Sequence, residues 1–165
     1  VFWAGKAFYF TQVFIVSLVC ENDLPETYGA VLWVWFEVLY ALAWLVFWAV
    51  WLVLIPMSHK FGNEGAIRHL WSKSILFQHN ANIILMNIEL LLSRWTMRPE
   101  HVIFCLYVGI AYTVFNNLVL QHKYKVQPYP FLDYDKAGVL GLIGLVVSLC
   151  AFFGFGVLLA SDLKK

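Results

Sequence analysis

Hydrophobic residues occupy five long stretches of the chain, and short polar connections separate them. A helix needs about 20 mostly apolar residues to cross the hydrocarbon core of a bilayer. Lipid offers no hydrogen-bond partners to exposed backbone groups, so stretches of this kind are expected to be helical. The five predicted helices run from about Trp3 to Cys20, Ala30 to Pro56, Ser74 to Leu92, His101 to Gln121 and Ala137 to Ala160. The predicted fold class is an all-α, polytopic transmembrane helix bundle, with residues 1–165 forming a single domain.

The composition agrees with a chain that lies in lipid. It is 62% hydrophobic and 13% charged, whereas soluble domains are about 45–50% apolar and about 25% charged. This excludes a soluble globular domain, a disordered chain and a secreted disulfide scaffold. The net charge of +1 gives no electrostatic basis for binding nucleic acid. We therefore expect membrane lipid as the partner, in an endomembrane or in the plasma membrane.

The three cysteines support the same interpretation. Cys20, Cys105 and Cys150 all lie in apolar stretches, and their number is odd. We expect buried free thiols that pack as small hydrophobic side chains.

Two connections carry structural predictions of their own. Within residues 57–73, Ile67, Leu70 and Trp71 share a helical face, which predicts a short helix lying in the membrane interface. Residues 128–132 contain two prolines, which forbid a continuous helix there. We expect this segment to form a rigid cap over the polar residues of the bundle.

The start and one face of the last helix can also be predicted. Asp133 or Asp135 is expected to cap its N-terminus. A stripe of small residues then follows one face of this helix: Ala137, Gly141, Gly144, Ser148 and Ala151. Such a stripe favours close packing against another helix of the same chain, and a homo-oligomer interface is the alternative.

The third predicted helix has an unusual number of polar residues for a spanning segment. They are Gln78, His79, Asn80, Asn82, Asn87 and Glu89. Polar groups in hydrocarbon are costly unless they face a partner or a cavity. We therefore expect this helix to be the most buried of the five. For each asparagine, hydrogen bonding to a neighbouring helix is the simplest interpretation.

A polar cluster is predicted where the first, third and fourth helices pass the same face of the bundle. Thr11, His79, Asn82, Asn116 and His122 fall at similar depths on these helices. Three functions are open for such a cluster. A histidine can activate a threonine hydroxyl as a nucleophile, His79 and His122 can ligate a haem, or the cluster can line a transport path. We expect neither a resident cofactor nor a metal.

Three short motifs resemble a known superfamily of membrane proteins. They are F-T-Q in the first helix, Q-H-N-A-N in the third, and H-K-Y-K-V-Q-P-Y-P-F-L-D-Y before the fifth. This pattern resembles the superfamily that joins the androgen-induced and androgen-regulated membrane hydrolases to the rolling stone proteins. The resemblance covers nearly the whole chain. It implies a bundle of six spanning helices. The family's own first helix would then be missing from this chain, and the five predicted helices would correspond to the other five.

The resemblance also implies roles for particular residues. The hydrolase branch cleaves fatty-acid esters of hydroxy fatty acids with a threonine that matches Thr11. His79 matches the first histidine of that branch's N-H-x-x-H-T motif, and Asn82 stands where the second, catalytic histidine is found. Since an asparagine cannot act as a general base, this form looks more like the rolling stone branch.

Two functional hypotheses follow from the sequence. The first is a multi-pass membrane protein of the rolling stone type, whose buried polar groups mainly specify helix packing. The alternative is an intramembrane hydrolase of lipid esters, with Thr11 as nucleophile and His79 or His122 as the base.

Overall fold

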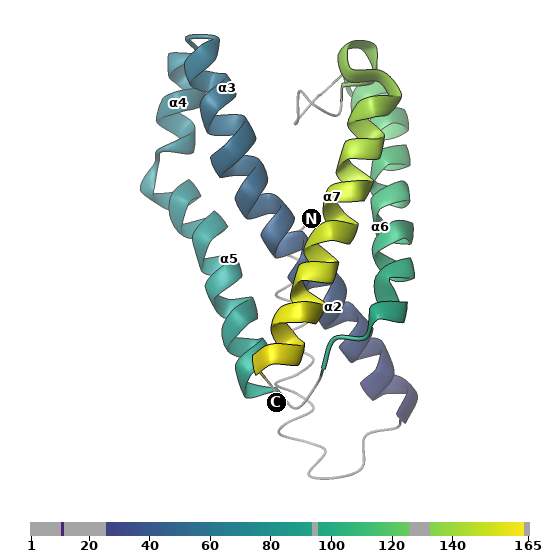
Figure 1. The fold of residues 1–165 in the computed structure, drawn as a ribbon. Coiled ribbons are helices and arrows are strands. Elements are labelled where there is room, and N and C mark those ends of the chain that lie inside the picture. The colour runs from purple at the N-terminus through teal and green to yellow at the C-terminus, as the bar shows by residue number, and fades with distance from the viewer. Residues whose placement is uncertain (1–10, 12–25, 94–95, 126–132, 164–165) are drawn as a thin grey trace.

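The computed structural model describes residue 11 and residues 26–93, 96–125 and 133–163, and within these ranges the chain is helical with no strand (Figure 1). Among the described residues, four helical segments are long and apolar enough to cross a membrane: Thr27–Lys60, Lys73–Leu92, Pro99–Lys123 and Gly138–Leu163. The prediction of an all-helical chain is therefore confirmed for the described residues. Apart from Thr11, the first predicted helix lies outside them.

The first of these segments continues further than the sequence indicates. It consists of α2 (Glu26–Trp48), a π-helical stretch η1 (Ala49–Leu54) and α3 (Ile55–Lys60). The predicted end at Pro56 is wrong, because the helix continues through this proline to Lys60. Proline has no N–H to donate inside a helix, and Pro56 directly follows the π-helical stretch η1, where the regular hydrogen-bond pattern is already altered.

A hairpin follows, and its turns are stabilised by local caps. The φ of +61° at Gly62 reverses the chain, and the side chain of Asn63 accepts the N–H of Ala66 at 3.0 Å to start α4 (Glu64–Leu70). Ser72 accepts the N–H of Ile75 in the same way to start α5 (Lys73–Leu92). The short helix predicted in this connection is present, and 47% of the surface of Trp71 behind it is exposed.

The last two segments also contain irregular turns. A 3₁₀ turn η2 (Pro99–His101) leads into α6 (Val102–Phe115), which continues as a π-helical stretch η3 (Asn116–Lys123). The final helix α7 (Tyr134–Leu163) is kinked at Gly138, whose φ is +57°. Residues 128–132, which are predicted to form a cap over the polar residues of the bundle, lie outside the described residues.

Asp133 directly precedes α7, which is the position predicted for a capping residue. The hydrogen bond described for its carboxylate comes from the Nε2 of Gln121, at 3.1 Å. Asp133 is buried, so this bond ties the end of η3 to the start of α7.

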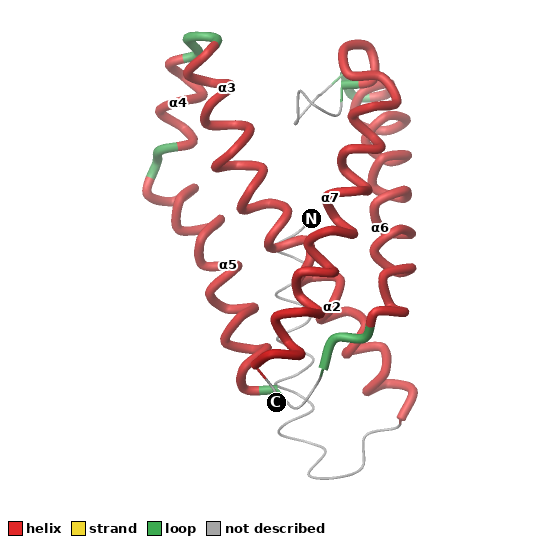
Figure 2. Tube along the Cα trace, in the orientation of Figure 1, coloured by secondary structure: helices red, strands yellow, loops and turns green. Residues whose placement is uncertain are grey.

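Two arms diverge from a common end of the molecule (Figure 1). The chain from α3 to α5 forms one arm and α6 with α7 forms the other, and Figure 2 shows that the connections lie at the helix ends. The helix α2 joins the arms, because it packs against both α5 and α7, while α6 packs against α7. The core lies along α2, with Phe36, Tyr40 and Met86 fully buried.

The prediction that the third helix is the most buried is wrong among the described helices. In the most apolar stretch of residues 27–60, 39% of the residues are buried, against 22% in α5. The reason is position: α2 contacts both arms, whereas α5 contacts the rest of the bundle mainly through α2.

Two members of the small-residue stripe of the last helix do not pack within the chain. Gly144 and Ala151 are exposed. The buried face of α7 is formed instead by Leu149, Phe153, Gly156 and Ala160. Close helix packing in this chain therefore uses a face that the spacing of small residues does not reveal.

Gly156 is the small residue on which this packing depends. A Cβ at this position would lie 2.8 Å from the Sδ of Met97 and 2.8 Å from the Cε1 of Tyr40. Because real Cβ atoms essentially never come this close, only glycine lets α7 pass over Tyr40.

Candidate functional site

The structure buries two members of the predicted polar cluster and exposes two others. Asn82 and Asn116 are each only 1% exposed, whereas Thr11 and His122 are exposed and His79 is half-buried. The helices that carry His79 and His122 belong to different arms (Figure 1). Within the described residues, no hydrogen bond joins Thr11, His79 and His122 to one another.

Two asparagines of α5 form hydrogen bonds with aromatic residues of the preceding segment. The hydroxyl of Tyr40 donates to the Oδ1 of Asn87 at 3.0 Å, and the indole Nε1 of Trp51 donates to the Oδ1 of Asn80 at 3.2 Å. Each asparagine also donates its Nδ2 at 2.8 Å to a backbone carbonyl one turn earlier on α5. Each amide therefore accepts one hydrogen bond through its oxygen and donates one through its nitrogen. The accepted bonds hold α5 against the preceding helical segment.

A carboxyl group is fully buried in the middle of the apolar segment α2. Glu37 has no exposed surface. Its Oε1 accepts the backbone N–H of Arg98 at 2.8 Å, and its Oε2 lies 2.5 Å from the Nδ1 of His101. A buried carboxyl group is tolerated only where partners replace water. These two contacts provide them and tie the segment before α6 to α2.

An aromatic residue one turn earlier on α2 extends this contact. The guanidinium of Arg98 lies 4.4 Å from the ring of Trp33, and the imidazole of His101 approaches the same ring edge-on at 5.5 Å. The indole Nε1 of Trp33 donates to the carbonyl of Thr96 at 2.7 Å. We call Trp33, Glu37, Arg98 and His101 the turn cluster. It fixes the connection between α5 and α6 by a cation–π contact and by hydrogen bonds.

Chemically, the turn cluster contains an oriented imidazole but no described nucleophile. Contact with a carboxyl group fixes the ring orientation of His101, as it does for histidine bases in many enzymes. The side chain of His101 is only 18% exposed. Each side-chain hydrogen bond described for the turn cluster joins α2 to residues 96–101, so these bonds serve the packing of the chain.

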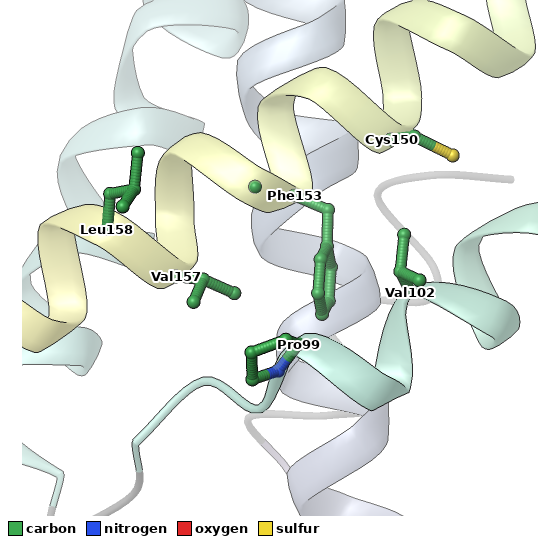
Figure 3. Close-up of a pocket in the computed structure, with 7 residues that line it drawn as sticks. Pro99, Val102, Cys150, Phe153, Val157 and Leu158 are labelled. Atoms are coloured by element: carbon green, nitrogen blue, oxygen red, sulfur yellow. The ribbon is translucent and has the colours of Figure 1, made fainter.

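An apolar groove begins at the same turn. It has a volume of about 370 Å³ and is lined by Pro99, Val102, Cys150, Phe153, Gly154, Val157 and Leu158 (Figure 3). The lining comes from the start of the α6 segment on one side and from α7 on the other. The volume lies within the range of about 300–1,000 Å³ that is typical of small-molecule sites.

The sequence indicated some of these residues and missed others. Glu37 stands out because a carboxylate in an apolar stretch needs a partner. Neither Arg98 nor His101 could be assigned to it, since both lie at a helix end where charged residues are ordinary. For Trp33 no signal existed, because tryptophan is abundant throughout the chain.

The described residues contain no group of three or more histidine, cysteine, aspartate or glutamate side chains that could hold a metal ion. Two free cysteines are described, Cys105 buried and Cys150 half-buried at the groove. Comparisons with known protein families, with curated proteins and with solved structures find no match for this chain.

Proposed function

We propose that this protein is a multi-pass integral membrane protein of the rolling stone type, in which polar residues within the helices serve helix packing. Four long apolar helical segments support its place in a membrane. The resemblance of its three motifs to the superfamily supports the family, and Asn82 at the position of the catalytic histidine favours the rolling stone branch. An endomembrane and the plasma membrane are both compatible with this proposal.

The use of the α5 amides carries the proposal. Asn80 and Asn87 accept hydrogen bonds from aromatic side chains and donate to their own helix. They lie seven residues apart, or about two helical turns, so they form a ladder along one face of α5. Polar groups in a membrane helix are expected to be used in this way when they specify which helices pack together.

Alkaline carbonate extraction of membranes from cells that express the full chain tests the membrane assignment. We expect the protein to stay in the pellet at high pH, as a spanning protein does. Release into the supernatant would contradict the proposal.

Substitution of the amides tests their packing role. Asn80→Leu and Asn87→Leu, which leave the aromatic donors without partners, should each lower the melting temperature in detergent. Asn117→Leu is a suitable comparison, because the Oδ1 of Asn117 is buried without a hydrogen-bond partner. If all three variants melt alike, the ladder does not hold the helices together.

A lipid ester hydrolase is the second candidate, and one observation favours it. The Nδ1 of His79 is buried and has no hydrogen-bond partner, so a ring nitrogen remains available to accept a proton. In this proposal, Thr11 is the nucleophile and His79 or His122 is the base.

Labelling with a lipid-like fluorophosphonate separates the two candidates. Label that is lost in Thr11→Ala and kept in Thr96→Ala supports the hydrolase. Thr96 is an exposed threonine whose described bond uses only its backbone carbonyl. Absence of label from the wild-type protein supports the packing role.

A further inference from the structure

We infer that the groove between the start of the α6 segment and α7 binds one acyl chain of a glycerophospholipid, whose phosphate contacts Arg98. This inference rests on the proposed place of the protein in a membrane. It assigns a lipid site to a definite surface, which neither the family resemblance nor the packing role provides.

The direction of the groove supports an acyl chain as the occupant. Along α7 the lining runs from Leu158 to Cys150. These residues lie about 8 Å and about 20 Å from the end of the helix at Leu163, taking a rise of about 1.5 Å per residue. The groove therefore extends from near the end of a spanning segment toward its middle, as an acyl chain does.

The chemistry of the lining agrees with this occupant. The side chains of Val102, Phe153, Val157 and Leu158 are hydrocarbon (Figure 3). Gly154 contributes no side chain, and beyond its chain neighbours and the backbone of its own helix no atom lies within 4 Å of the position its Cβ would take. The missing side chain leaves room in the middle of the groove.

Arg98, the residue before the first lining residue Pro99, supplies a positive charge close to the groove in the sequence. It is exposed although its guanidinium lies over the ring of Trp33. Its backbone N–H is held by the buried Glu37. The guanidinium is thus positioned before any ligand arrives, which lowers the entropy lost on binding, and its planar fork matches a phosphate group.

The charge and the groove together select a phospholipid over a simple hydrocarbon. The first residue of the candidate spanning segment Pro99–Lys123 follows Arg98 directly, so in a membrane we expect the guanidinium at the depth of the lipid headgroups. Glu100 is also exposed at this turn, and its carboxylate opposes an anionic headgroup. Glu100→Gln should therefore strengthen binding of an anionic lipid.

Photolabelling in nanodiscs tests the inference. The probe is phosphatidylglycerol that carries a diazirine on one acyl chain, diluted into phosphatidylcholine. We expect mass spectrometry to find label on α7 between residues 150 and 158. Gly154→Leu places a side chain in the space that the acyl chain would occupy and should reduce this label about tenfold, which corresponds to about 1.4 kcal/mol.

Gly144→Leu is the matched control, because Gly144 is also exposed on α7 and its Cβ position is equally open. This variant should keep the wild-type label between residues 150 and 158. Arg98→Gln should weaken binding of the probe about fivefold, as expected for the loss of one basic residue near the membrane surface.

The possible results separate clearly. Equal labelling of residues 150–158 in wild type and Gly154→Leu overturns the groove site and indicates ordinary bilayer lipid. Label that depends on Gly154 but not on Arg98 overturns the phosphate contact. A protein that is not embedded loses the label on every helix face, so failure of the membrane assignment is distinguishable from failure of the site.

Discussion

The carboxyl group of Glu37 lies 2.5 Å from the Nδ1 of His101, 64 residues later in the chain. The glutamate is fully buried, whereas the side chain of the histidine is 18% exposed. One contact therefore connects the interior of α2 to the end of the bundle at which α6 begins.

Removing this carboxyl group should destabilise the protein strongly. Glu37→Ala leaves the Arg98 N–H and the imidazole of His101 without an acceptor, at a cost on the order of 3 kcal/mol. Glu37→Gln should cost less, because an amide oxygen still accepts one of these bonds. Melting in detergent measures both, with Glu100→Gln as the exposed control. Equal melting of Glu37→Ala and wild type would show that the contact does not stabilise the fold.

A double-mutant cycle isolates the pair itself. We expect Glu37→Gln and His101→Gln to show a coupling free energy of about 0.5–3 kcal/mol, since residues in direct contact are not additive. Strict additivity would mean that the two side chains act independently.

The hydroxyl of Tyr40 should contribute a small, measurable amount. Tyr40→Phe removes the donor to Asn87 and should cost about 0.6 kcal/mol, with about 1.7 kcal/mol as the upper limit for such bonds in a membrane. Tyr107→Phe is the control, because Tyr107 is 63% exposed on α6. If the two variants lose the same stability, the Tyr40 hydrogen bond is not the cause.

Glycine-to-alanine substitutions on α7 should have opposite signs. Gly156→Ala forces a methyl group against Tyr40 and Met97 and should cost about 1–3 kcal/mol. Gly144→Ala meets no neighbour and should stabilise the helix by about 0.5–1 kcal/mol. Thermal melts of the two variants and the wild type in detergent measure these changes in stability. Stabilisation by both substitutions would exclude close approach of α7 at Gly156.

His79 offers a test of packing against catalysis. Its Nδ1 is buried without a partner, so His79→Leu should keep or raise the melting temperature, because an unsatisfied polar atom is removed. Hydrolysis of a lipid ester is measured on the same sample. A folded His79→Leu that retains an activity present in the wild type excludes this histidine as the base, and loss of that activity without loss of stability supports the hydrolase.

The sequence alone determined where the helices are. Long apolar stretches force helical backbone in lipid whatever their neighbours are, and four of the five predicted segments are helical in the described residues. It also singled out Asn80 and Asn87, because amides in an apolar stretch need partners. The identity of those partners, Trp51 and Tyr40, was not predictable, since aromatic residues occur on every helix.

The tertiary structure decided which faces meet. Periodicity relates residues within one helix, so it carries no information on contacts such as that between Glu37 and His101 across separate helices. The small-residue stripe shows this limit: Gly144 and Ala151 are exposed, while Gly156 makes the close contact. Helix α2 is the most buried described helix because both arms pack on it. The physical reason is that burial depends on what surrounds a helix, whereas the sequence of a helix fixes only what it can tolerate.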